Sequence, residues 1–231
     1  MTDARSEIHT GTRTGPLTES HTGTRTGPLT ESHAGPPTGT LTEPHTEPRT
    51  GTRTAQGRGA PVEAQVLPTP TGPLALLAHE GVIVAAGFTA DPREMFVRLP
   101  SHLQALGLVP VDDLGHPARA VRDYLDGDLK ALDEVELTQP GTPKRQRLLK
   151  ALREVPPGVT ISYAELAERA GLPRTAARAA GGACAQNLIA PFVPCHRILP
   201  SGGGFGGYYY GTPVKRWLLV HEKAIPQTTL L

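Results

Sequence analysis

Cysteine is rare in this chain, and one of its two copies lies beside a histidine. The sequence A-P-F-V-P-C-H-R-I-L-P, residues 190–200, places Cys195 directly before His196, after an apolar run interrupted by prolines. A thiol is a strong nucleophile only as the thiolate, and a neighbouring base or positive charge is the usual way to favour that form. The alternative is a buried structural cysteine, which is the commoner role of a lone cysteine. Only the elements around this pair can decide between the two.

The cysteine count also limits the choice of cofactor and compartment. Cys184 and Cys195 form no C-x-x-C pair, and no Cys/His cluster has metal-ligand spacing, so we expect neither a metal nor another cofactor. A chain without a disulfide framework suits the reducing cytoplasm. The N-terminal sequence M-T-D-A-R-S-E-I-H-T has no apolar core of a signal peptide, and no apolar run approaches the roughly 18 residues of a membrane span. We therefore expect a soluble, cytoplasmic protein with no membrane partner.

Charge is divided unevenly along the chain, although the net charge is only +1. Residues 61–143 carry five basic and twelve acidic side chains, whereas residues 144–231 carry twelve basic and four acidic ones. A basic region of this kind favours a polyanionic partner, with nucleic acid as the leading candidate. The alternative is a solvated basic surface that faces the acidic part of the same chain.

Residues 1–60 are of low complexity. The sequence H-T-G-T-R-T-G-P-L-T-E-S occurs at 9–20 and again at 21–32, and degraded copies follow. Thr, Gly, Pro, Ser, Glu and Arg dominate, so the segment cannot bury enough apolar surface to offset its chain entropy. We expect a disordered, solubilising tail; weak attraction of its arginines to DNA is the alternative.

The next part, residues 61–140, is predicted to be a small α/β domain. Its segment 62–90 holds two or three short apolar runs separated by turn residues, which predicts a β-meander. Two helices are predicted to follow: one at residues 92–106, interrupted by Pro100, and one within residues 116–132 that begins at His116 and ends around Gly127.

A further strand is predicted at residues 131–138, and Q-P-G-T-P at 139–143 is a turn that marks the domain boundary. The second domain is expected to span residues 141–226, with residues 227–231 as a C-terminal tail. The expected fold class is α+β: the small α/β domain, then a mostly helical domain with a helix-turn-helix.

Helical periodicity dominates the second domain. Residues 143–155 begin with a proline and place leucines on one face and basic side chains on the others. Ser162 and Glu165 form the S-x-x-E capping box of a second helix. A third helix is predicted at residues 173–187, and the short glycine-containing turn before it predicts a helix-turn-helix.

The third helix consists almost entirely of alanine and glycine, with Arg174 and Arg178 projecting. The Gly181–Gly182 pair costs about 1 kcal/mol per residue relative to alanine, so its presence needs a reason. A helix without bulky side chains can lie very close to another surface. That surface is either a neighbouring helix or a DNA groove, and the basic balance of this half favours DNA.

Taken in order, these motifs resemble the C-terminal domain of the O6-alkylguanine-DNA alkyltransferases, also called methylated-DNA–protein-cysteine methyltransferases. The resemblance covers residues 141–223, is weaker over 62–138, and leaves 1–60 without a counterpart. The motifs that carry it are G-T-P at 141–143, I-S-Y-A-E-L-A at 161–167, A-A-R-A-A-G-G-A at 176–183, Asn187, P-C-H-R at 194–197 and V-K-R-W-L-L-V-H-E at 214–222.

The resemblance implies a role for each catalytic residue. Cys195 would accept the alkyl group, His196 would act as base through a water molecule, and Glu222 would orient that base. Tyr163 would press on a phosphate and donate a hydrogen bond to the leaving base. Asn187 would tie the third helix to the active-site loop.

The resemblance also implies how the substrate is held. Tyr208 and the backbone of Tyr209 would line the pocket, and the carbonyl of Ile198 would meet the exocyclic amine of the base. Arg178 would fill the gap left by a flipped nucleotide, with the helix-turn-helix in the minor groove. Arg197 would be a structural ion-pair partner. The remaining DNA contacts implied are Arg174, Ala179 and Gly182.

The implied function is repair of double-stranded DNA by direct reversal. The alkyl group of O6-alkylguanine, or of O4-alkylthymine, would pass irreversibly to Cys195 in a single turnover, performed by a monomer at the nucleoid. Three alternatives stay open: a non-catalytic lesion sensor, a DNA-binding regulator of the same fold, and an unrelated cysteine hydrolase. Cys195 argues against the sensor, and the basic half argues against the hydrolase.

The chain departs from the family pattern in four places. Tyr210 takes a position commonly held by glycine, and we expect it to narrow the pocket against large adducts such as benzyl. The other departures are P-P-G at 156–158, the lack of aromatic residues in K-R-Q-R-L-L at 144–149, and Leu188 after Asn187.

Overall fold

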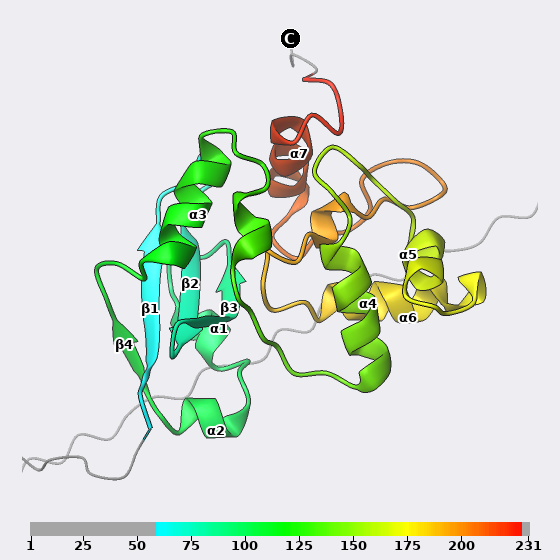
Figure 1. Cartoon of the computed structure of the whole chain (residues 1–231). Coiled ribbons are helices and arrows are strands. Elements are labelled where there is room, and N and C mark those ends of the chain that lie inside the picture. Colours follow the sequence, from blue (N-terminus) through cyan, green and yellow to red (C-terminus); the bar gives the residue numbers. More distant parts are fainter. Residues whose placement is uncertain (1–58, 228–231) are drawn as a thin grey trace, which may run out of the picture. The chain divides into compact units, whose positions relative to one another are not determined.

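A small mixed sheet begins the described part of the chain. The computed structural model describes residues 59–227, so the predicted tail at 1–60 and the end of the chain lie largely outside the described residues. The strand order is β3-β2-β1-β4 (Figure 1), and β1 pairs antiparallel with β2 and parallel with β4. The strands are β1 (Val62–Leu67), β2 (Leu74–His79), β3 (Val82–Gly87) and β4 (Leu108–Pro110).

The β-meander predicted for residues 62–90 is confirmed. Its second hairpin pairs His79 with Val82, which leaves Glu80 and Gly81 as a two-residue turn. Both have positive φ, 51° and 81°, as a type I′ turn requires, and glycine tolerates that conformation without steric cost.

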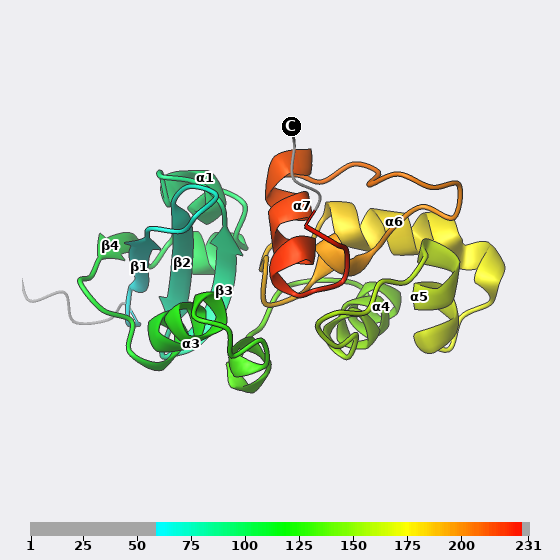
Figure 2. The same ribbon diagram turned by 90° about the horizontal axis from the view of Figure 1, so that it is seen from above.

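Helices cover both faces of this sheet. On one face, alternate strand residues pack on Met95 of the short helix α1 (Arg93–Phe96) and on Leu103 of the short helix α2 (Ser101–Gln104). They also pack on Leu99, which lies between these two helices. The interruption of that helix at Pro100 was predicted. The other face packs on α3 (His116–Leu125), as Figure 2 shows from above. The inner strand β2 is therefore apolar except for His79 at its end.

The strand predicted at residues 131–138 is wrong. Residues Ala131–Glu134 form a 3-10 turn, and only Leu137 makes an isolated bridge to Ile83. The buried side chains here are Leu132 and Val135, whose spacing of three fits a helical turn and not the period of two in a strand. The short strand β4 was not predicted.

The second half of the described residues is helical, as predicted. Thr142 caps α4 by accepting a hydrogen bond from the backbone N–H of Arg145. Ser162 and Glu165 form the predicted capping box, with hydrogen bonds of 3.2 and 2.6 Å. The helices are α4 (Pro143–Arg153), α5 (Tyr163–Arg169), α6 (Ala177–Ala185), preceded by a 3-10 turn at Arg174–Ala176, and α7 (Thr212–His221).

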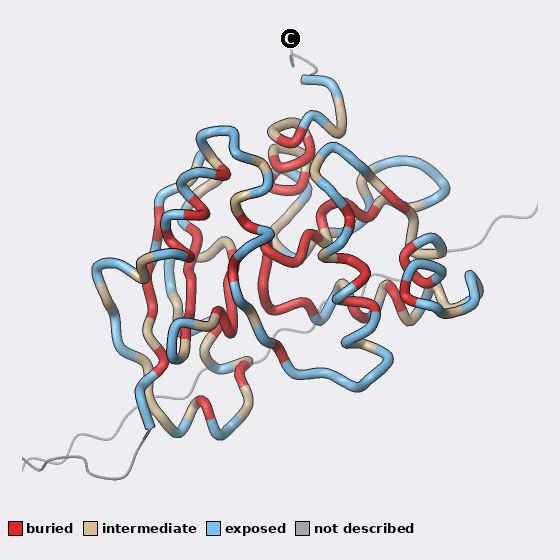
Figure 3. Tube along the Cα trace, in the orientation of Figure 1, coloured by how far each residue is buried: buried red, intermediate tan, exposed pale blue. Residues whose placement is uncertain are grey.

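One large core runs through both halves. Buried residues of the sheet, α3, α4, α5, α6 and α7 belong to the same apolar cluster, and Figure 3 shows buried stretches along the chain on both sides of residues 139–143. The division into domains at residue 140 stays a prediction. Among the described residues, no helix is long and apolar enough to cross a membrane.

Candidate active site

The Cys195–Arg197 segment forms a 3-10 turn whose C-terminal end is fixed by pairing with the chain just before α5. The N–H of Ile161 donates to the carbonyl of Arg197 at 3.0 Å, and the N–H of Leu199 donates to the carbonyl of Ile161 at 2.9 Å. The turn that carries the cysteine is thereby joined to the start of the helix-turn-helix. The apolar run before it, residues 188–194, is fully buried.

Cys195 faces an open pocket of about 270 Å³. Five predicted site residues meet there, Cys195 included, and they come from α5, from the segment after α6 and from the loop before α7. The pocket is lined by Tyr163, Gly181, Cys184, Ala185, Asn187, Ala190, Cys195, Gly207, Tyr208, Tyr209 and Tyr210. Cys184 is thus a second thiol on the pocket wall, and both cysteines are free.

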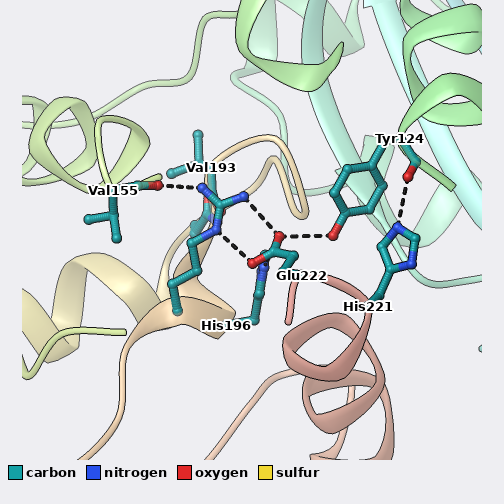
Figure 4. Close-up of polar contacts among 8 residues, drawn as sticks. Tyr124, Val155, Val193, His196, His221 and Glu222 are labelled. Atoms are coloured by element: carbon teal, nitrogen blue, oxygen red, sulfur yellow. Dashed lines mark hydrogen bonds and ion pairs between the residues drawn. The ribbon is translucent and has the colours of Figure 1, made fainter. Parts of the chain in front are cut away.

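Behind the cysteine, a buried carboxylate binds four donor groups. Glu222 Oε1 accepts from His196 Nε2 at 2.9 Å, from Arg197 Nη2 at 2.8 Å and from the Tyr124 hydroxyl at 2.9 Å. Its Oε2 accepts from Arg197 Nε at 2.9 Å, and Arg197 also donates to the Val155 carbonyl. Figure 4 shows Tyr124 and His196 converging on Glu222 from different parts of the chain.

This network fixes the protonation states. Burial alone would raise the pKa of Glu222, but His196 and Arg197 outweigh it and lower that pKa to about 2. Burial lowers the pKa of His196 below its ordinary value, although Glu222 opposes this. A neutral imidazole beside a carboxylate must keep its proton on Nε2, the atom that donates to Glu222. The lone pair is therefore on Nδ1, which is buried and has no partner among the described residues.

A second chain of hydrogen bonds reaches the sulfur directly. Asn187 Nδ2 lies 3.3 Å from Cys195 Sγ and 2.7 Å from the Val193 carbonyl. The amide oxygen of Asn187 accepts from the N–H of Ile189 at 3.1 Å and from Gln139 Nε2 at 3.2 Å. Asn187 therefore joins the end of α6 to the cysteine loop.

Two effects oppose each other at the thiol. Burial raises the pKa of Cys195, while the Asn187 hydrogen bond and the positive charge of Lys215 oppose the rise. Lys215 is itself buried, and its ammonium donates to the carbonyls of Ile198 at 2.7 Å and Phe205 at 2.5 Å. Without a bound substrate the thiol is thus held neutral, close to a base and a cation. The Ile198 carbonyl retains one lone pair for another donor.

Burial keeps Tyr163 and Tyr208 in the pocket as neutral phenols. Burial raises the pKa of Tyr163, and the nearby Cys184 and Cys195 add to the effect. Burial also raises the pKa of Tyr208 well above its ordinary value, and its hydroxyl has no partner among the described residues. Tyr209 is mostly exposed, with the guanidinium of Arg98 4.8 Å above its ring.

Apart from Tyr163, the residues expected to contact DNA lie outside this pocket. Arg178 is exposed on α6. Arg174 donates to Glu168 at 2.6 Å, an exposed ion pair. Ala179 and Gly182 line a separate groove between α6 and the start of α4.

Tyr210 reaches from the active-site loop to the sheet. Its ring packs edge-on against Phe88, and its hydroxyl lies 3.7 Å from Met95 Sδ. A Cβ on Gly87 would lie 2.1 Å from that hydroxyl, so the glycine makes the space for it.

Four contributors to the site were not recognised from the sequence. They are Tyr124, Gln139, Lys215 and His221. The Nε2 atom of His221 lies 2.7 Å from the backbone oxygen of Tyr124, and this contact holds α7 on α3. Lys215 lies inside a motif that was recognised, V-K-R-W-L-L-V-H-E, and a lysine on the apolar face of that helix was a usable signal. Tyr124 and Gln139 gave no local signal.

Comparison with known proteins agrees with this geometry. Residues 143–224 match the family model for the 6-O-methylguanine DNA methyltransferase, DNA binding domain. The methylated-DNA–protein-cysteine methyltransferase of Shigella flexneri is 35% identical over 157 residues, which is 67% of this chain and 91% of the relative. The protein of that name from Mycobacterium bovis is 37% identical over 166 residues, which is 71% of this chain and 93% of the relative.

A solved structure of a relative is also similar to this chain. Mycobacterium tuberculosis OGT in complex with DNA superposes with a TM-score of 0.59 at 33% identity, over 71% of this chain and 94% of that one. The chain belongs to the methylated-DNA–protein-cysteine methyltransferase family.

Proposed function

We propose that this protein repairs DNA by direct reversal, transferring the alkyl group of O6-alkylguanine to Cys195 in one irreversible step. The observation that carries the proposal is the position of Cys195 in an open pocket, backed by the buried pair of His196 and Glu222. The pocket supplies the nucleophile, and the pair supplies a neutral base.

In the proposed reaction, the thiol proton passes through a water molecule to Nδ1 of His196. The imidazolium formed is stabilised by Glu222, which stays ionised because its pKa is about 2. The thiolate attacks the alkyl carbon, the bond from that carbon to the guanine oxygen breaks, and its electron pair goes to the base. Tyr163, kept as a neutral phenol because burial raises its pKa, donates a hydrogen bond to the leaving guanine, and the proton taken up by His196 returns through water to that base.

The product is a thioether, which is stable in water, so Cys195 is not regenerated. Each protein molecule therefore acts once, and the reaction consumes protein and lesion in equal amounts. Methyl groups on O4 of thymine have the same chemistry and belong to the proposed substrate range. No cofactor takes part in the proposed step.

The lesion must leave the base stack to reach the thiol, at a cost of a few kcal/mol. We assign the helix-turn-helix of α5 and α6 to the minor groove, where the small residues Ala179 and Gly182 allow close approach. Arg178, exposed on α6, fills the gap left by the flipped nucleotide. The basic second half of the chain supplies long-range attraction to the phosphates. The protein is proposed to work as a monomer on DNA in the cytoplasm.

One experiment tests the proposal. The protein is incubated with a duplex oligonucleotide that carries O6-methylguanine, and its intact mass is measured. We expect a single gain of one CH₂ group that maps to Cys195 and is absent in Cys195→Ser. Tight binding to the lesion with no change in mass would instead support a sensor, and the proposal would be wrong.

Tyr210 is proposed to restrict the adducts accepted. Its ring forms part of the pocket wall and is braced by Phe88 and Met95. Tyr210→Gly should speed transfer of a benzyl group more than transfer of a methyl group, measured as single-turnover rates on matched oligonucleotides. If the substitution changed both rates equally, the proposal that Tyr210 restricts adduct size would be wrong.

A further inference from the structure

Gln139 lies in the segment between α3 and α4, where the sequence predicts only a turn. The side chain is nevertheless buried, at 7% exposure, and uses both ends of its amide. Its Oε1 accepts from the N–H of Leu188 at 3.0 Å, and its Nε2 donates to Asn187 Oδ1 at 3.2 Å. Its backbone carbonyl accepts from Gln146 Nε2 at 2.5 Å, which fixes the segment to α4.

These contacts dictate how two amides point. The N–H of Leu188 can only donate, so the oxygen of Gln139 must face it and the NH₂ group must face Asn187. The N–H of Ile189 can likewise only donate, so the oxygen of Asn187 must face Ile189 and Gln139. The NH₂ group of Asn187 is then left facing Cys195 Sγ, 3.3 Å away. The backbone N–H groups of Leu188 and Ile189 thus fix the direction of the hydrogen bonds that run from Gln139 through Asn187 to the sulfur.

We propose that Gln139 is a positioning residue for alkyl transfer: by donating to Asn187 Oδ1 it keeps Asn187 Nδ2 directed at the Cys195 thiolate. The inference rests on the proposed function of Cys195 as acceptor. A thiolate is stabilised by a donated N–H and destabilised by a carbonyl oxygen in the same place. If the amide of Asn187 loses its orientation, the fraction of Cys195 present as thiolate falls.

A purely structural role is the competing explanation, and the chain offers a matched control for it. Gln65 in β1 has the same 7% exposure. Its Nε2 donates to the Asp112 carbonyl at 2.7 Å, and its Oε1 accepts from the N–H of Leu114 at 2.9 Å. Both glutamines therefore bind one backbone N–H and donate once, but only Gln139 donates to a group that binds the sulfur.

The test compares Gln139→Met with Gln65→Met. Alkylation of Cys195 by iodoacetamide is followed as a function of pH, and the product is mapped by peptide mass so that Cys184 does not contribute. In Gln139→Met we expect the midpoint pH to rise by about half to one unit, and methyl transfer from DNA near neutral pH to slow by about three- to tenfold. In Gln65→Met the thermal stability falls but the midpoint stays at the wild-type value.

The effect must also act through Asn187. In an Asn187→Ala background, Gln139→Met should give no further shift of the midpoint, because the two positions are coupled. An unchanged midpoint in Gln139→Met, or a shift that persists without Asn187, overturns the proposal. If Gln139→Met does not fold, Gln139→Glu keeps the acceptor for Leu188 and removes the donor, and it must raise the midpoint at least as far.

The two proposals fail separately. Reaction with iodoacetamide needs no DNA, so the role of Gln139 can be contradicted while methyl transfer from DNA still occurs. Conversely, a wild-type protein that does not accept a methyl group from DNA would contradict the function and leave the thiol measurement unaffected.

Discussion

Two hydrogen-bonded chains reach the Cys195–His196 pair, and they are built from different groups. On the histidine side, Glu222 is buried among charged and polar donors that include Arg197 and Tyr124. On the sulfur side, Gln139 and Asn187 are neutral amides. Both sides are shielded from water, so the difference does not come from exposure.

The two sides control different properties of the Cys195–His196 pair. Ions inside a protein interact strongly and are costly to separate. The charged groups around Glu222 therefore control whether a proton lies on His196 or on the carboxylate. Neutral amides carry little long-range field but have a definite direction, so the Asn187 side controls the orientation of a single N–H. Breaking the charged side should harm folding and chemistry together, whereas breaking the neutral side should harm mainly the thiol.

The largest effect is expected from Glu222→Gln. The substitution leaves the guanidinium of Arg197 buried without its carboxylate, which should cost about 3–5 kcal/mol of unfolding free energy. Methyl transfer should fall more than about a hundredfold, because the imidazolium of His196 loses its stabilising charge. Denaturant unfolding and single-turnover rates measure the two effects.

A matched control separates burial from charge. Glu168→Gln breaks an exposed ion pair with Arg174, and such pairs are worth about 0–1 kcal/mol. A loss in Glu168→Gln as large as that in Glu222→Gln would contradict the comparison.

The second-largest effect is expected in the pH dependence of the unfolding free energy of the wild-type protein. The pKa of Glu222 is about 2 in the folded state against an ordinary 4.5, so its contribution is complete above pH 4.5 and is lost as pH falls toward 2. This contribution is on the order of 3 kcal/mol. The lowered pKa of His196 acts in the same direction, and its part is lost as pH falls below its ordinary 6.5. Unfolding measured from pH 7 to 2 should be steeper in the wild type than in Glu222→Gln.

A smaller effect on folding, with a clear effect on the thiol, is expected from Asn187→Ala. Removing the N–H that reaches the sulfur should raise the pKa of Cys195 by about one to two units, since hydrogen bonds to charged groups contribute about 1.5–3 kcal/mol. The iodoacetamide midpoint measures it. The comparison fails if Asn187→Ala destabilises the fold as much as Glu222→Gln yet leaves that midpoint unchanged.

The smallest effect is expected from Tyr124→Phe. Loss of one neutral donor to Glu222 should cost about 1 kcal/mol of stability. The carboxylate then attracts the proton of His196 more strongly, which raises the pKa of that histidine. The acid limb of the transfer rate should therefore move to higher pH by a few tenths of a unit. A move to lower pH would show that the hydroxyl acts in some other way.

Local sequence patterns were enough to predict much of the fold. The capping box of Ser162 and Glu165, the turn at Gly81 and the helix interruption at Pro100 depend on neighbours within a few residues. Tyr163, Asn187 and Cys195, which meet in the pocket, came from motifs whose order resembles one family. The strand predicted at residues 131–138 does not form. Its two buried residues, Leu132 and Val135, have the spacing of a helical turn, and this spacing prevails over the alternating polarity of the segment.

The remaining parts of the site depend on contacts that no local pattern encodes. Tyr124 looks like any aromatic residue on the buried face of an amphipathic helix, and its partner Glu222 lies 98 positions away. Gln139 lies in a turn, where glutamine is unremarkable, and its partner lies 48 positions away. A side chain of this kind is recognised only when the tertiary fold has placed its partner.

The contact between Tyr124 and Glu222 has a consequence for the order of folding. The chain must be synthesised past the end of α7 before the carboxylate of Glu222 exists to meet either the tyrosine or the histidine. Contacts of such long sequence separation form late, because a large loop must close first. A nascent chain that already displays Cys195 and His196 therefore lacks the carboxylate that orients and stabilises this base, and full reactivity appears only when α7 docks and brings Glu222 to His196.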